Sequence, residues 1–436
     1  MDKKRTYLDL NFKPDPEKYV LTTLFLDSIS PLRDAADAIA AESSTGTWTN
    51  VGTMNDSIFD ELSAKVYELN ELTKVIKIAY PLALFETDNI PQVLADVGGN
   101  IFGMKEVRRL QLMDIELPSA FLKANPGPAR GIQGIREYTG VGDRPLLGTI
   151  IKPKVGLPTK EHARVAYEAW VGGVDLVKDD ENLTDQPFNP FDERIKHTLE
   201  AKVKAEQETG EKKIYAANIS GHIMDMEHRA ELIRQLGGEC MMIDIMTVGY
   251  AGLQHMRMKN TGLIIHGHRA MHGAFTHIAG HGITMLVLAK LARMAGVDSL
   301  HTGTVIGKME GNKKDVTEID DFLKSEWGGL KTTLPVASGG LHPGHVAKLY
   351  KLLGKDVLIN MGGGIHGHPD GTRAGAIAAR QALEAAINGI PLEKYAKEKG
   401  HCELALALDK WGVFGEEKYT KPITYFSKYL HKPDTK

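Results

Sequence analysis

The stretch Gly-Gly-Val-Asp-Leu-Val-Lys-Asp-Asp-Glu-Asn at residues 172–182 joins a short apolar run to one lysine and three consecutive carboxylates. A short apolar run of this kind predicts a buried strand. Side chains of a strand point alternately to its two faces, so Lys178 and Asp180 would share one face, and Glu181 would follow where the strand ends. The stretch therefore predicts a strand that delivers a cluster of charges to one place.

Seven other apolar runs recur along the chain, at 146–151, 214–219, 241–246, 263–265, 299–303, 334–337 and 357–361. Segments between them have helical character, at 161–170, 192–209, 227–236, 285–295, 344–353 and 374–387. Eight strand–helix units in about 250 residues predict a (β/α)8 barrel, also called a TIM barrel. A doubly wound sheet is the alternative α/β architecture, but it rarely needs eight units.

The residues before the first of these runs mix helical and strand patterns. A helix is predicted near residues 30–43, a strand near 74–80 and a helix near 90–98. The segment Asn125-Pro-Gly-Pro reads as a hinge, because both prolines and glycine interrupt regular structure. We therefore expect an N-terminal α+β domain at residues 1–135 and a (β/α)8 barrel domain with a C-terminal extension at residues 136–436.

Composition narrows the class of protein. A chain of 436 residues that is 42% hydrophobic is long enough for two domains, one of them large. The formal net charge of −3 provides no basic field for nucleic acid or for a membrane surface. No apolar run approaches the roughly 20 residues of a membrane span, and no signal peptide is expected. Two cysteines, Cys240 and Cys402, exclude a disulfide scaffold and favour a cytoplasmic protein.

Functional residues of such barrels collect at the C-terminal ends of the strands. Seven of the eight predicted ends carry polar or glycine residues, namely 152–154, 178–181, Asn218, 266–269, His301 with 307–308, 338–340 and 362–364. Any one of these motifs has an ordinary structural explanation, since single histidines are often buried and glycine triplets are often turns. Residues with purely structural roles would be scattered over both ends of the barrel, so the pattern predicts one active site.

Two glycine clusters, at 338–340 and 362–364, indicate a phosphate site. Glycine lets backbone N–H groups approach an anion closely, and loops after the seventh and eighth strands commonly bind phosphate in such barrels. Four cations are expected around the same mouth, namely Lys152, Lys154, Arg269 and Lys308. Phosphate sites on both sides of the mouth predict a small bisphosphorylated substrate.

The charges at 178–181 suit a magnesium ion, which prefers oxygen ligands. Asp180 and Glu181 provide two of them, but a lysine has the wrong charge to be the third. The neutral amine of Lys178 would become an anionic ligand if it captured carbon dioxide as a carbamate. A Lys-Asp-Asp-Glu sequence taken alone is commonly a solvated charged turn, and it is the other strand ends that favour the metal site.

Several motifs together resemble one family, the large subunit of ribulose-1,5-bisphosphate carboxylase/oxygenase (Rubisco). They are AAESSTGTW at 40–48, GGNIFGMK at 98–105, KPKVGL at 152–157, GGVDLVKDDEN at 172–182, HGHRAMH at 266–272, HTGTVIGKMEG at 301–311, SGGLHPG at 338–344 and GGGIHGHPDGTRAGA at 362–376. They span nearly the whole chain. The details look most like the archaeal, form III-like branch.

The resemblance implies a carboxy-lyase that enolises ribulose 1,5-bisphosphate and adds CO2, or O2, to give 3-phosphoglycerate or the oxygenase products. Lys178 would be the carbamylated lysine, made with activating CO2, and would hold Mg2+ with Asp180 and Glu181. The carbamate would take the C3 proton, Lys152 would handle protons at C2, and His268 would assist. Lys308 would cover the site on a mobile loop, with Glu42 as its ion-pair partner.

The resemblance also implies a set of substrate contacts, namely Glu42, Thr47, Trp48, Asn100, Lys154, Arg269, His301, Ser338, Gly339, Gly340, Gly362 and Gly363. In this family the N-terminal segment serves the barrel of a partner subunit. The protein would therefore be a homodimer or an assembly of dimers, and archaeal relatives generally lack a small subunit. The form III resemblance suggests that the bisphosphate comes from nucleotide (AMP) salvage.

The chain departs from the family at three places. Ile150 stands two residues before Lys152, where many members have threonine, and Met309 follows Lys308, where plants have leucine. The segment between Lys308 and Ser338 is also shorter than usual. Three alternatives remain to be weighed: a Rubisco-like enolase of sulfur salvage, a metal-dependent hydrolase barrel and a non-catalytic scaffold. The full set of substrate-contact residues argues against the enolase. A hydrolase would need a His-x-His early in the barrel and an aspartate on a late strand, and neither is found. The intact set of ionisable residues argues against a non-catalytic scaffold.

Overall fold

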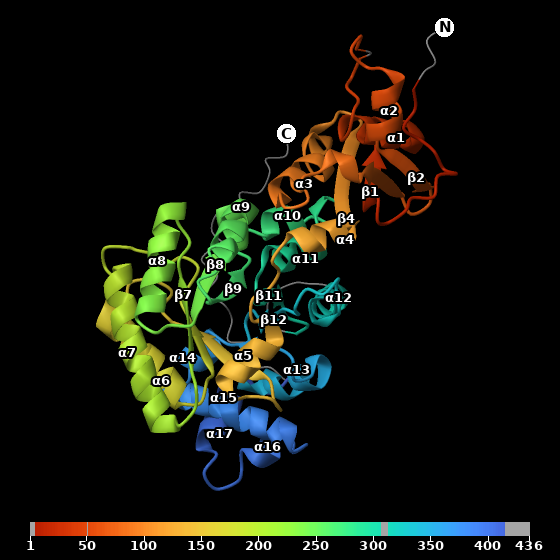
Figure 1. Ribbon diagram of the computed structural model, residues 1–436. Helices are drawn as coiled ribbons and strands as arrows, with labels where there is room; N and C mark the ends of the chain where they lie inside the picture. Colours follow the sequence, from red (N-terminus) through yellow and green to blue (C-terminus); the bar gives the residue numbers. More distant parts are fainter. Residues whose placement is uncertain (1–4, 50, 307–312, 415–436) are drawn as a thin grey trace, which may run out of the picture.

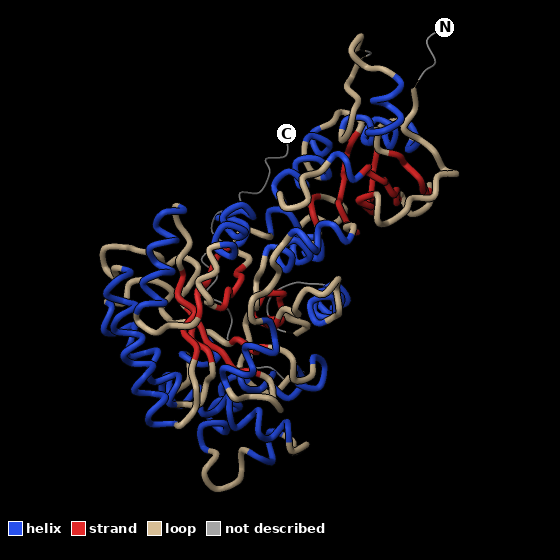
Figure 2. Tube along the Cα trace, in the orientation of Figure 1, coloured by secondary structure: helices blue, strands red, loops and turns tan. Residues whose placement is uncertain are grey.

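The computed structural model describes residues 5–49, 51–306 and 313–414, which form two sheets. Figure 1 shows the N-terminal elements gathered in one body and the barrel elements in a larger one, and Figure 2 shows helices on the outside of the barrel strands. Predicted residues Lys308 and the tail beyond 414 lie outside the described residues. The predicted α/β architecture, a closed parallel barrel with an N-terminal α+β part, is confirmed.

The N-terminal part is a five-stranded sheet covered by helices. Its strands, in spatial order, are β10 (Gly282–Ile283), β4 (Val107–Glu116), β1 (Tyr19–Ser28), β3 (Val75–Pro81) and β2 (Lys65–Asn70). The helices are α1 (Leu32–Glu42), α2 (Asp56–Leu62), α3 (Ile90–Val97) and α4 (Ser119–Ala124), with short 3-10 turns at Leu82–Leu84 and Asn100–Gly103. Apolar residues of α1 and of the central strands are buried against one another, and they belong to the same hydrophobic cluster as the apolar residues of the barrel. The predicted helices near 30 and 90 and the strand near 74 are confirmed.

Eight parallel strands close the barrel. They are β5 (Leu146–Ile150), β6 (Leu176–Lys178), β7 (Ile214–Asn218), β8 (Cys240–Asp244), β9 (Ile264–His268), β11 (Ser299–Gly303), β12 (Leu334–Ser338) and β13 (Leu358–Asn360). The main helices are α6 (Thr159–Val171), α7 (Phe191–Thr209), α8 (Ile223–Gln235), α9 (Ile245–Met258), α11 (Met285–Ala295), α12 (Lys313–Lys324), α13 (Val346–Leu353), α15 (Gly371–Ile387) and α17 (Cys402–Trp411). Short helical turns are α10 (Gly273–Thr276), α14 (Gly363–His366), α16 (Leu392–Tyr395) and a 3-10 turn at Pro343–His345.

Each of the eight predicted apolar runs overlaps one barrel strand. The run at 241–246 extends beyond its strand. The strand ends at Asp244, and Ile245 begins α9, a helix that the sequence pattern did not predict. Both the end of β8 and the start of α9 are buried, so the apolar run continues through the change of structure. Periodicity alone does not separate a buried strand from a buried helix in so short a run.

Helix α5 (Gly131–Thr139) lies under the barrel. Ile135 belongs to a separate cluster of buried apolar residues together with Leu146, Leu176 and Leu358 from the starts of three strands. The helix therefore closes the N-terminal end of the barrel, and the opposite end is left for the site.

A short connection ties the two sheets together. Gly282 and Ile283 of β10, which lie between two barrel strands in sequence, pair with Gln111 and Leu112 of β4. Thr284 continues the contact, since its backbone N–H donates to the Leu112 carbonyl at 3.0 Å. No helix in the described ranges is long and apolar enough to cross a membrane.

Candidate active site

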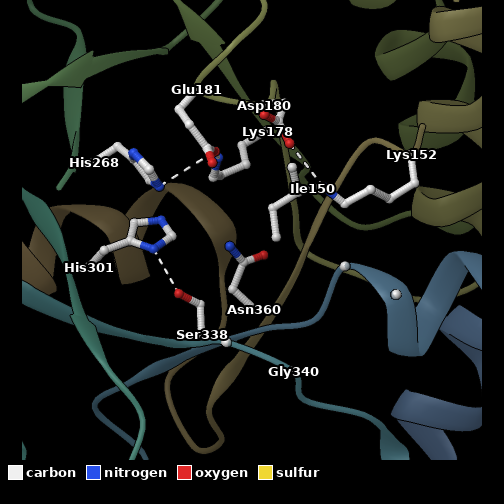
Figure 3. A pocket seen from close by; sticks show the side chains of 13 residues that line it. Ile150, Lys152, Lys178, Asp180, Glu181, His268, His301, Ser338, Gly340 and Asn360 are labelled. Atoms are coloured by element: carbon white, nitrogen blue, oxygen red, sulfur yellow. Dashed lines mark hydrogen bonds and ion pairs between the residues drawn. The ribbon is translucent and has the colours of Figure 1, made fainter. Parts of the chain in front are cut away.

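A cavity of about 230 Å³ opens at the C-terminal ends of the barrel strands. Its lining comes from six strands and from the turns that follow four of them, and Figure 3 shows these side chains converging. The lining residues are Ile150, Lys152, Lys178, Asp180, Glu181, His268, His301, Ser338, Gly339, Gly340, Asn360, Gly362 and Gly363. The cavity therefore gathers residues that are more than 200 positions apart in the sequence.

Two lysines and two carboxylates form the charged wall of this cavity. Lys152 Nζ lies 2.8 Å from Asp180 Oδ2, and Lys178 Nζ lies 3.8 Å from Glu181 Oε2. Lys178 Nζ also donates to the Asp179 carbonyl oxygen at 2.7 Å. Strand β6 ends at Lys178, and the turn that follows brings both carboxylates to the same mouth.

Burial changes the protonation of this wall. Lys178 is fully buried, and burial lowers the pKa of its amine although three carboxylates nearby oppose the shift. Burial by itself would raise the pKa of Glu181, but the attraction of Lys178 and His268 outweighs it and lowers that pKa. Burial thus shifts Lys178 toward its neutral form, beside a carboxylate that stays ionised.

Asp179 supports the wall from behind, and its side chain points away from the cavity. Its carboxylate accepts from the Tyr215 hydroxyl at 2.6 Å and from the Asn218 backbone N–H at 3.0 Å. His162 Nε2 lies 3.0 Å away and Arg194 Nε donates at 3.3 Å. Burial disfavours the charged form, but Arg194, His162 and Tyr215, led by Arg194, hold the pKa of Asp179 far below its usual range. The network fixes the backbone between the two charged residues that line the cavity.

His268 at the end of β9 faces the same carboxylates. Its Nδ1 lies 2.8 Å from Asp244 Oδ1, and its Nε2 lies 3.6 Å from Glu181 Oε2. The Ala270 backbone N–H also donates to Nδ1 at 3.2 Å, so this nitrogen is held from two sides and Nε2 faces the cavity. The ring is therefore oriented for proton exchange at Nε2.

A line of hydrogen bonds runs behind His301 on β11. Ser338 Oγ lies 2.8 Å from His301 Nδ1, His301 Nε2 lies 2.9 Å from His266 Nε2, and His266 Nδ1 lies 2.9 Å from Ser299 Oγ. Burial lowers the pKa of both histidines well below the usual value. Both rings are therefore neutral near pH 7, and His301 can act as a hydrogen-bond donor or acceptor but not as a fixed positive charge.

Glycine backbone forms the opposite side of the cavity. Gly339 and Gly340 follow β12 with φ of +123° and +69°, a conformation that other residues adopt only with strain. Gly362 and Gly363 follow β13, and a Cβ added at Gly362 would lie 3.1 Å from Lys152 Cε. These positions leave backbone exposed to a ligand, as an anion site requires.

Arg269 lies at the rim of this region without lining the cavity. A Cβ at Gly303 would lie 2.6 Å from its guanidinium nitrogen, so this glycine makes room for the side chain. Burial lowers the pKa of Arg269 to about 10, and Asp320 on α12 partly offsets the shift. A partly buried guanidinium remains charged at neutral pH and is suited to bind an anion.

The structure brings together most of the residues that the sequence predicted. Those that line the cavity are Lys152, Lys178, Asp180, Glu181, His268, His301, Ser338, Gly339, Gly340, Gly362 and Gly363. Lys154 is adjacent, with Nζ 3.9 Å from Glu181 Oε1. Lys308 lies outside the described residues.

Four predicted residues lie on the N-terminal part and do not line the cavity of their own chain. Asn100 Nδ2 donates to Glu42 Oε1 at 3.3 Å, so these two are neighbours. Thr47 lies in the loop after α1, and the next residue, Trp48, is 92% exposed, which is rare for so large an apolar side chain. The exposure of Thr47, Trp48 and Asn100 agrees with a role outside their own barrel.

Sequence reasoning missed two residues at this site. Asn360 lines the cavity, and its signal was a single amide inside the apolar run Val-Leu-Ile-Asn-Met at 357–361. His266 was noted only as part of a His-x-His pattern, yet it holds His301. A sequence does not reveal this contact, because Ser299 and His301 are more than 30 residues from His266.

Among the described residues, no three His, Cys, Asp or Glu side chains are grouped so that they could hold a metal ion. The carboxylates of Asp180 and Glu181 provide two oxygen ligands, and the buried amine of Lys178 lies 3.8 Å from Glu181 Oε2. The donor set is therefore one ligand short of a three-ligand protein site unless Lys178 is converted to an anion.

Comparisons with known sequences cover both parts of the chain. The family model described as the ribulose bisphosphate carboxylase large chain, catalytic domain, matches residues 131–411, and the one for its N-terminal domain matches residues 6–121. A ribulose bisphosphate carboxylase of Methanocaldococcus jannaschii is 50% identical over 426 residues, which cover 93% of this chain and 99% of the relative. A ribulose bisphosphate carboxylase of Pyrococcus abyssi is 48% identical over 421 residues, which cover 95% and 97%.

Solved structures agree with the sequence relatives. An octameric Rubisco of Pyrococcus horikoshii, in complex with sulfate ion, superposes with a TM-score of 0.88 at 46% identity, over 94% of this chain and 98% of that one. A dimeric archaeal Rubisco from Hyperthermus butylicus superposes with a TM-score of 0.87 at 44% identity, over 93% and 98%. The matches extend over both parts of the fold, and the chain belongs to the ribulose bisphosphate carboxylase large-chain family.

Proposed function

We propose that this protein is a ribulose-bisphosphate carboxylase/oxygenase, a carboxy-lyase that converts ribulose 1,5-bisphosphate, CO2 and water to two molecules of 3-phosphoglycerate. The observation that carries the proposal is the buried Lys178 beside Glu181 in a cavity whose far wall is glycine backbone. The archaeal relatives of the same length are named for this activity. They support the carboxylase over the Rubisco-like enolase.

Lys178, Asp180 and Glu181 are the residues that we assign to hold Mg2+. The fit depends on Lys178, because its amine can add CO2 only in the neutral form, which burial favours. The reaction forms an N–C bond and releases one proton, which leaves a carbamate anion as the third oxygen donor. Bound Mg2+ would supply a Lewis acid that polarises a substrate carbonyl.

The side chains around this centre have separate tasks in the proposal. Lys152 is assigned to move protons at C2, since its Nζ reaches Asp180 across the mouth of the cavity. His268 is assigned to proton exchange at Nε2, with Asp244 fixing its ring. Carbamylated Lys178 is assigned to remove the C3 proton. Lys308 is assigned to the incoming carboxylate, with Glu42 as its partner, on the family resemblance alone.

The two phosphates are assigned to opposite sides. Gly340, Gly362 and Gly363 offer backbone to one phosphate, with Thr47, Trp48 and Lys308 contributed to the same side. Arg269 and His301 are assigned to the other phosphate, where the guanidinium supplies the positive charge. Ser338 is assigned to the sugar chain and Asn100 to the metal-bound substrate. Gly339 and Lys154 are assigned to substrate binding at the mouth of the cavity.

We also propose a homodimer or an assembly of dimers without a small subunit. Dimeric and octameric archaeal Rubisco structures resemble this chain, and Trp48 is exposed where a partner's barrel could receive it. We further propose that the two domains comprise residues 1–135 and 136–436. The two free cysteines favour a cytoplasmic location, and we propose that AMP salvage supplies the bisphosphate.

The test is fixation of radiolabelled bicarbonate with ribulose bisphosphate and Mg2+ under anaerobic conditions. We expect acid-stable label in phosphoglycerate from the intact protein and none from Lys178→Ala. Removal of divalent metal with a chelator should abolish fixation, and added Mg2+ should restore it. Absence of fixation by the folded wild-type protein would overturn the proposal.

A further inference from the structure

Arg269 is a partly buried arginine whose guanidinium has no hydrogen-bond acceptor among the described residues. The guanidinium lies against the backbone of Gly303 at the end of β11, since a Cβ there would be 2.6 Å from Nη2. Other buried arginines of the barrel are satisfied. Arg257 donates to a backbone carbonyl and to Asp298, and Arg293 donates to four backbone carbonyls. Arg269 is therefore held by packing and keeps its donors for a ligand.

Asp320 is a buried acid on α12, the helix that packs against β11 and β12 (Figure 1). It is 2% exposed, and its Oδ1 has no hydrogen-bond partner among the described residues. The hydroxyl of Thr302, the residue before Gly303 on β11, is also buried and unpaired in that part of the chain. A buried carboxyl oxygen without a partner is costly, so its presence calls for an explanation.

Two cations attract the carboxyl group of Asp320. Lys324 lies on the same helix, but its Nζ is already 3.5 Å from the carboxylate of Asp321. Arg269 follows β9, and Asp320 is the acid among the described residues that acts on its charge. Asp320 and Arg269 thus face each other without a closer competitor for either charge.

The other elements packed against α12 do not supply a free charge. On α11, Lys290 pairs with Asp114, and Arg293 has its donors on carbonyls. On β11, burial lowers the pKa of His301 so that the ring is neutral, and β12 has no ionisable side chain. The charge of Asp320 therefore acts mainly on Arg269.

The charge of Asp320 changes within the physiological range. Burial raises the pKa of its carboxyl to about 6, because Thr302, Lys324 and Arg269 oppose the shift only in part. The ionised carboxylate attracts the guanidinium and competes with an anionic ligand for the same positive charge. The protonated carboxyl has no net charge and does not compete.

We propose that Asp320 is a positioning residue that sets how strongly Arg269 binds an anion, drawing the guanidinium toward α12 when the carboxyl is ionised and releasing it to the ligand when the carboxyl is protonated. The inference rests on the proposed function for the identity of the ligand, a phosphate group of the substrate. Affinity for an anion then falls as the pH rises and Asp320 ionises. Asp320→Asn, which is neutral at every pH, keeps Arg269 in its strongly binding state.

The first measurement is the affinity for inorganic sulfate at pH 5 and pH 8, by calorimetric titration. Sulfate keeps its charge over this range, whereas a phosphate ester gains charge near pH 6. Asp320→Asn and wild type should bind sulfate alike at pH 5, and the variant should bind roughly three- to tenfold more tightly at pH 8. Asp321→Asn is the control, because its exposed side chain should leave the protein like wild type. The same affinity ratio at both pH values would overturn the inference.

The second measurement asks whether Asp320 acts through Arg269. It uses pentane-1,5-diol bisphosphate at pH 8, whose second phosphate keeps it bound when Arg269 is replaced. In an Arg269→Gln background, Asp320→Asn should change the affinity by no more than roughly twofold. If the full effect persisted, the carboxylate would repel the anion directly, and the positioning role would be wrong. Asp320→Leu, which also lacks an ionisable group, replaces Asp320→Asn if that variant does not fold.

Kinetics separate positioning from a structural role. The KM for ribulose bisphosphate of wild type, divided by that of Asp320→Asn, should rise between pH 6 and pH 8, while the ratio of the two kcat values stays constant. A fall in kcat at every pH, with no change in the KM ratio, would indicate a structural role and overturn the inference. If sulfate binding depends on pH as expected but the wild-type protein fixes no carbon dioxide, the proposed function fails and the control of anion binding by Asp320 stands.

Discussion

At the scale of single residues, Asp179 is the clearest test of how the charged wall is held. Replacing it by asparagine keeps the shape but leaves the buried Arg194 without its anion. Breaking a buried pair in this way costs about 3–5 kcal/mol of unfolding free energy. We expect Asp179→Asn to lose that much in denaturant titrations, whereas Tyr215→Phe, which removes one hydrogen bond, loses about 1 kcal/mol. Equal stability of Asp179→Asn and wild type would contradict this account.

Asp320 predicts a dependence of stability on pH. Its side chain is buried on α12, and burial raises the pKa of its carboxyl from 3.8 to about 6. Between these values the folded protein holds a proton that the unfolded chain has released, so stability is lost as pH rises through this window. The loss amounts to roughly 3 kcal/mol.

Asp320→Asn removes this titration. The unfolding free energy of Asp320→Asn minus that of wild type should therefore increase by roughly 3 kcal/mol as the pH is raised from 4 to 7, as measured by urea unfolding. The neighbouring Asp321 is the control, because its side chain is 80% exposed and Asp321→Asn should change little with pH. A constant difference between Asp320→Asn and wild type across this range would refute the assignment.

The site was largely predictable at this scale where residues carry charge or lack a side chain. Lys178 with Asp180 and Glu181, and the glycines after two strands, stand out because such groups are rarely placed at the end of an apolar strand without a use. Asn360 was not predictable in the same way, since one amide in an apolar strand does not show whether it faces a cavity. That depends on residues such as Ile150, which lie on another strand.

At the scale of elements, the closeness of α14 and α15 determines the position of the glycine wall. A Cβ at Gly375 on α15 would lie 2.0 Å from the Ile365 carbonyl oxygen on α14. Gly375→Ala should therefore push α14 and the adjoining Gly362 away from the cavity. We expect stability to fall by about 1–3 kcal/mol and the affinity for a bisphosphate to fall by roughly tenfold or more. Calorimetric binding and thermal unfolding measure the two effects.

Gly142→Ala is the control for this prediction. Nothing lies within 4 Å of a Cβ at Gly142, so the substitution should alter neither quantity. If Gly375→Ala bound the bisphosphate as tightly as Gly142→Ala, the contact between α14 and α15 would have no part in forming the site.

The sequence predicted the barrel strands better than the N-terminal sheet, for a physical reason. Barrel strands are buried on both faces, so each one is a continuous apolar run that periodicity detects. β4 alternates buried with exposed residues, and charged side chains interrupt it. The pairing of β4 with β10 depends on contacts between residues about 170 positions apart, which local patterns do not contain.

At the scale of the whole molecule, the exposed Trp48 leads to a test of the dimer. If Trp48 completes the barrel of the partner subunit, Lys178→Ala disables its own site and Trp48→Ala disables the partner's site. Mixed dimers of the two variants then contain one intact site each. Because half of randomly formed dimers are mixed, co-refolded variants should regain about a quarter of wild-type fixation.

The opposite arrangement gives a different result. If Trp48 served its own barrel, both sites of a mixed dimer would be defective, and co-refolding would restore nothing. Each variant refolded alone provides the baseline, and the fraction of mixed dimers is measured by tagging one of the two variants.

The pairing of β10 with β4 also affects how the chain is made. During synthesis, β4 emerges from the ribosome long before its outer neighbour, because residues 282–283 follow residues 111–112 by roughly 170 positions, or on the order of 10–30 s at usual rates. For that time the nascent sheet has an open edge, which invites aggregation. Arg108 and Arg109 are exposed on β4 and place charge on this edge, so the strand carries its own protection until its partner arrives.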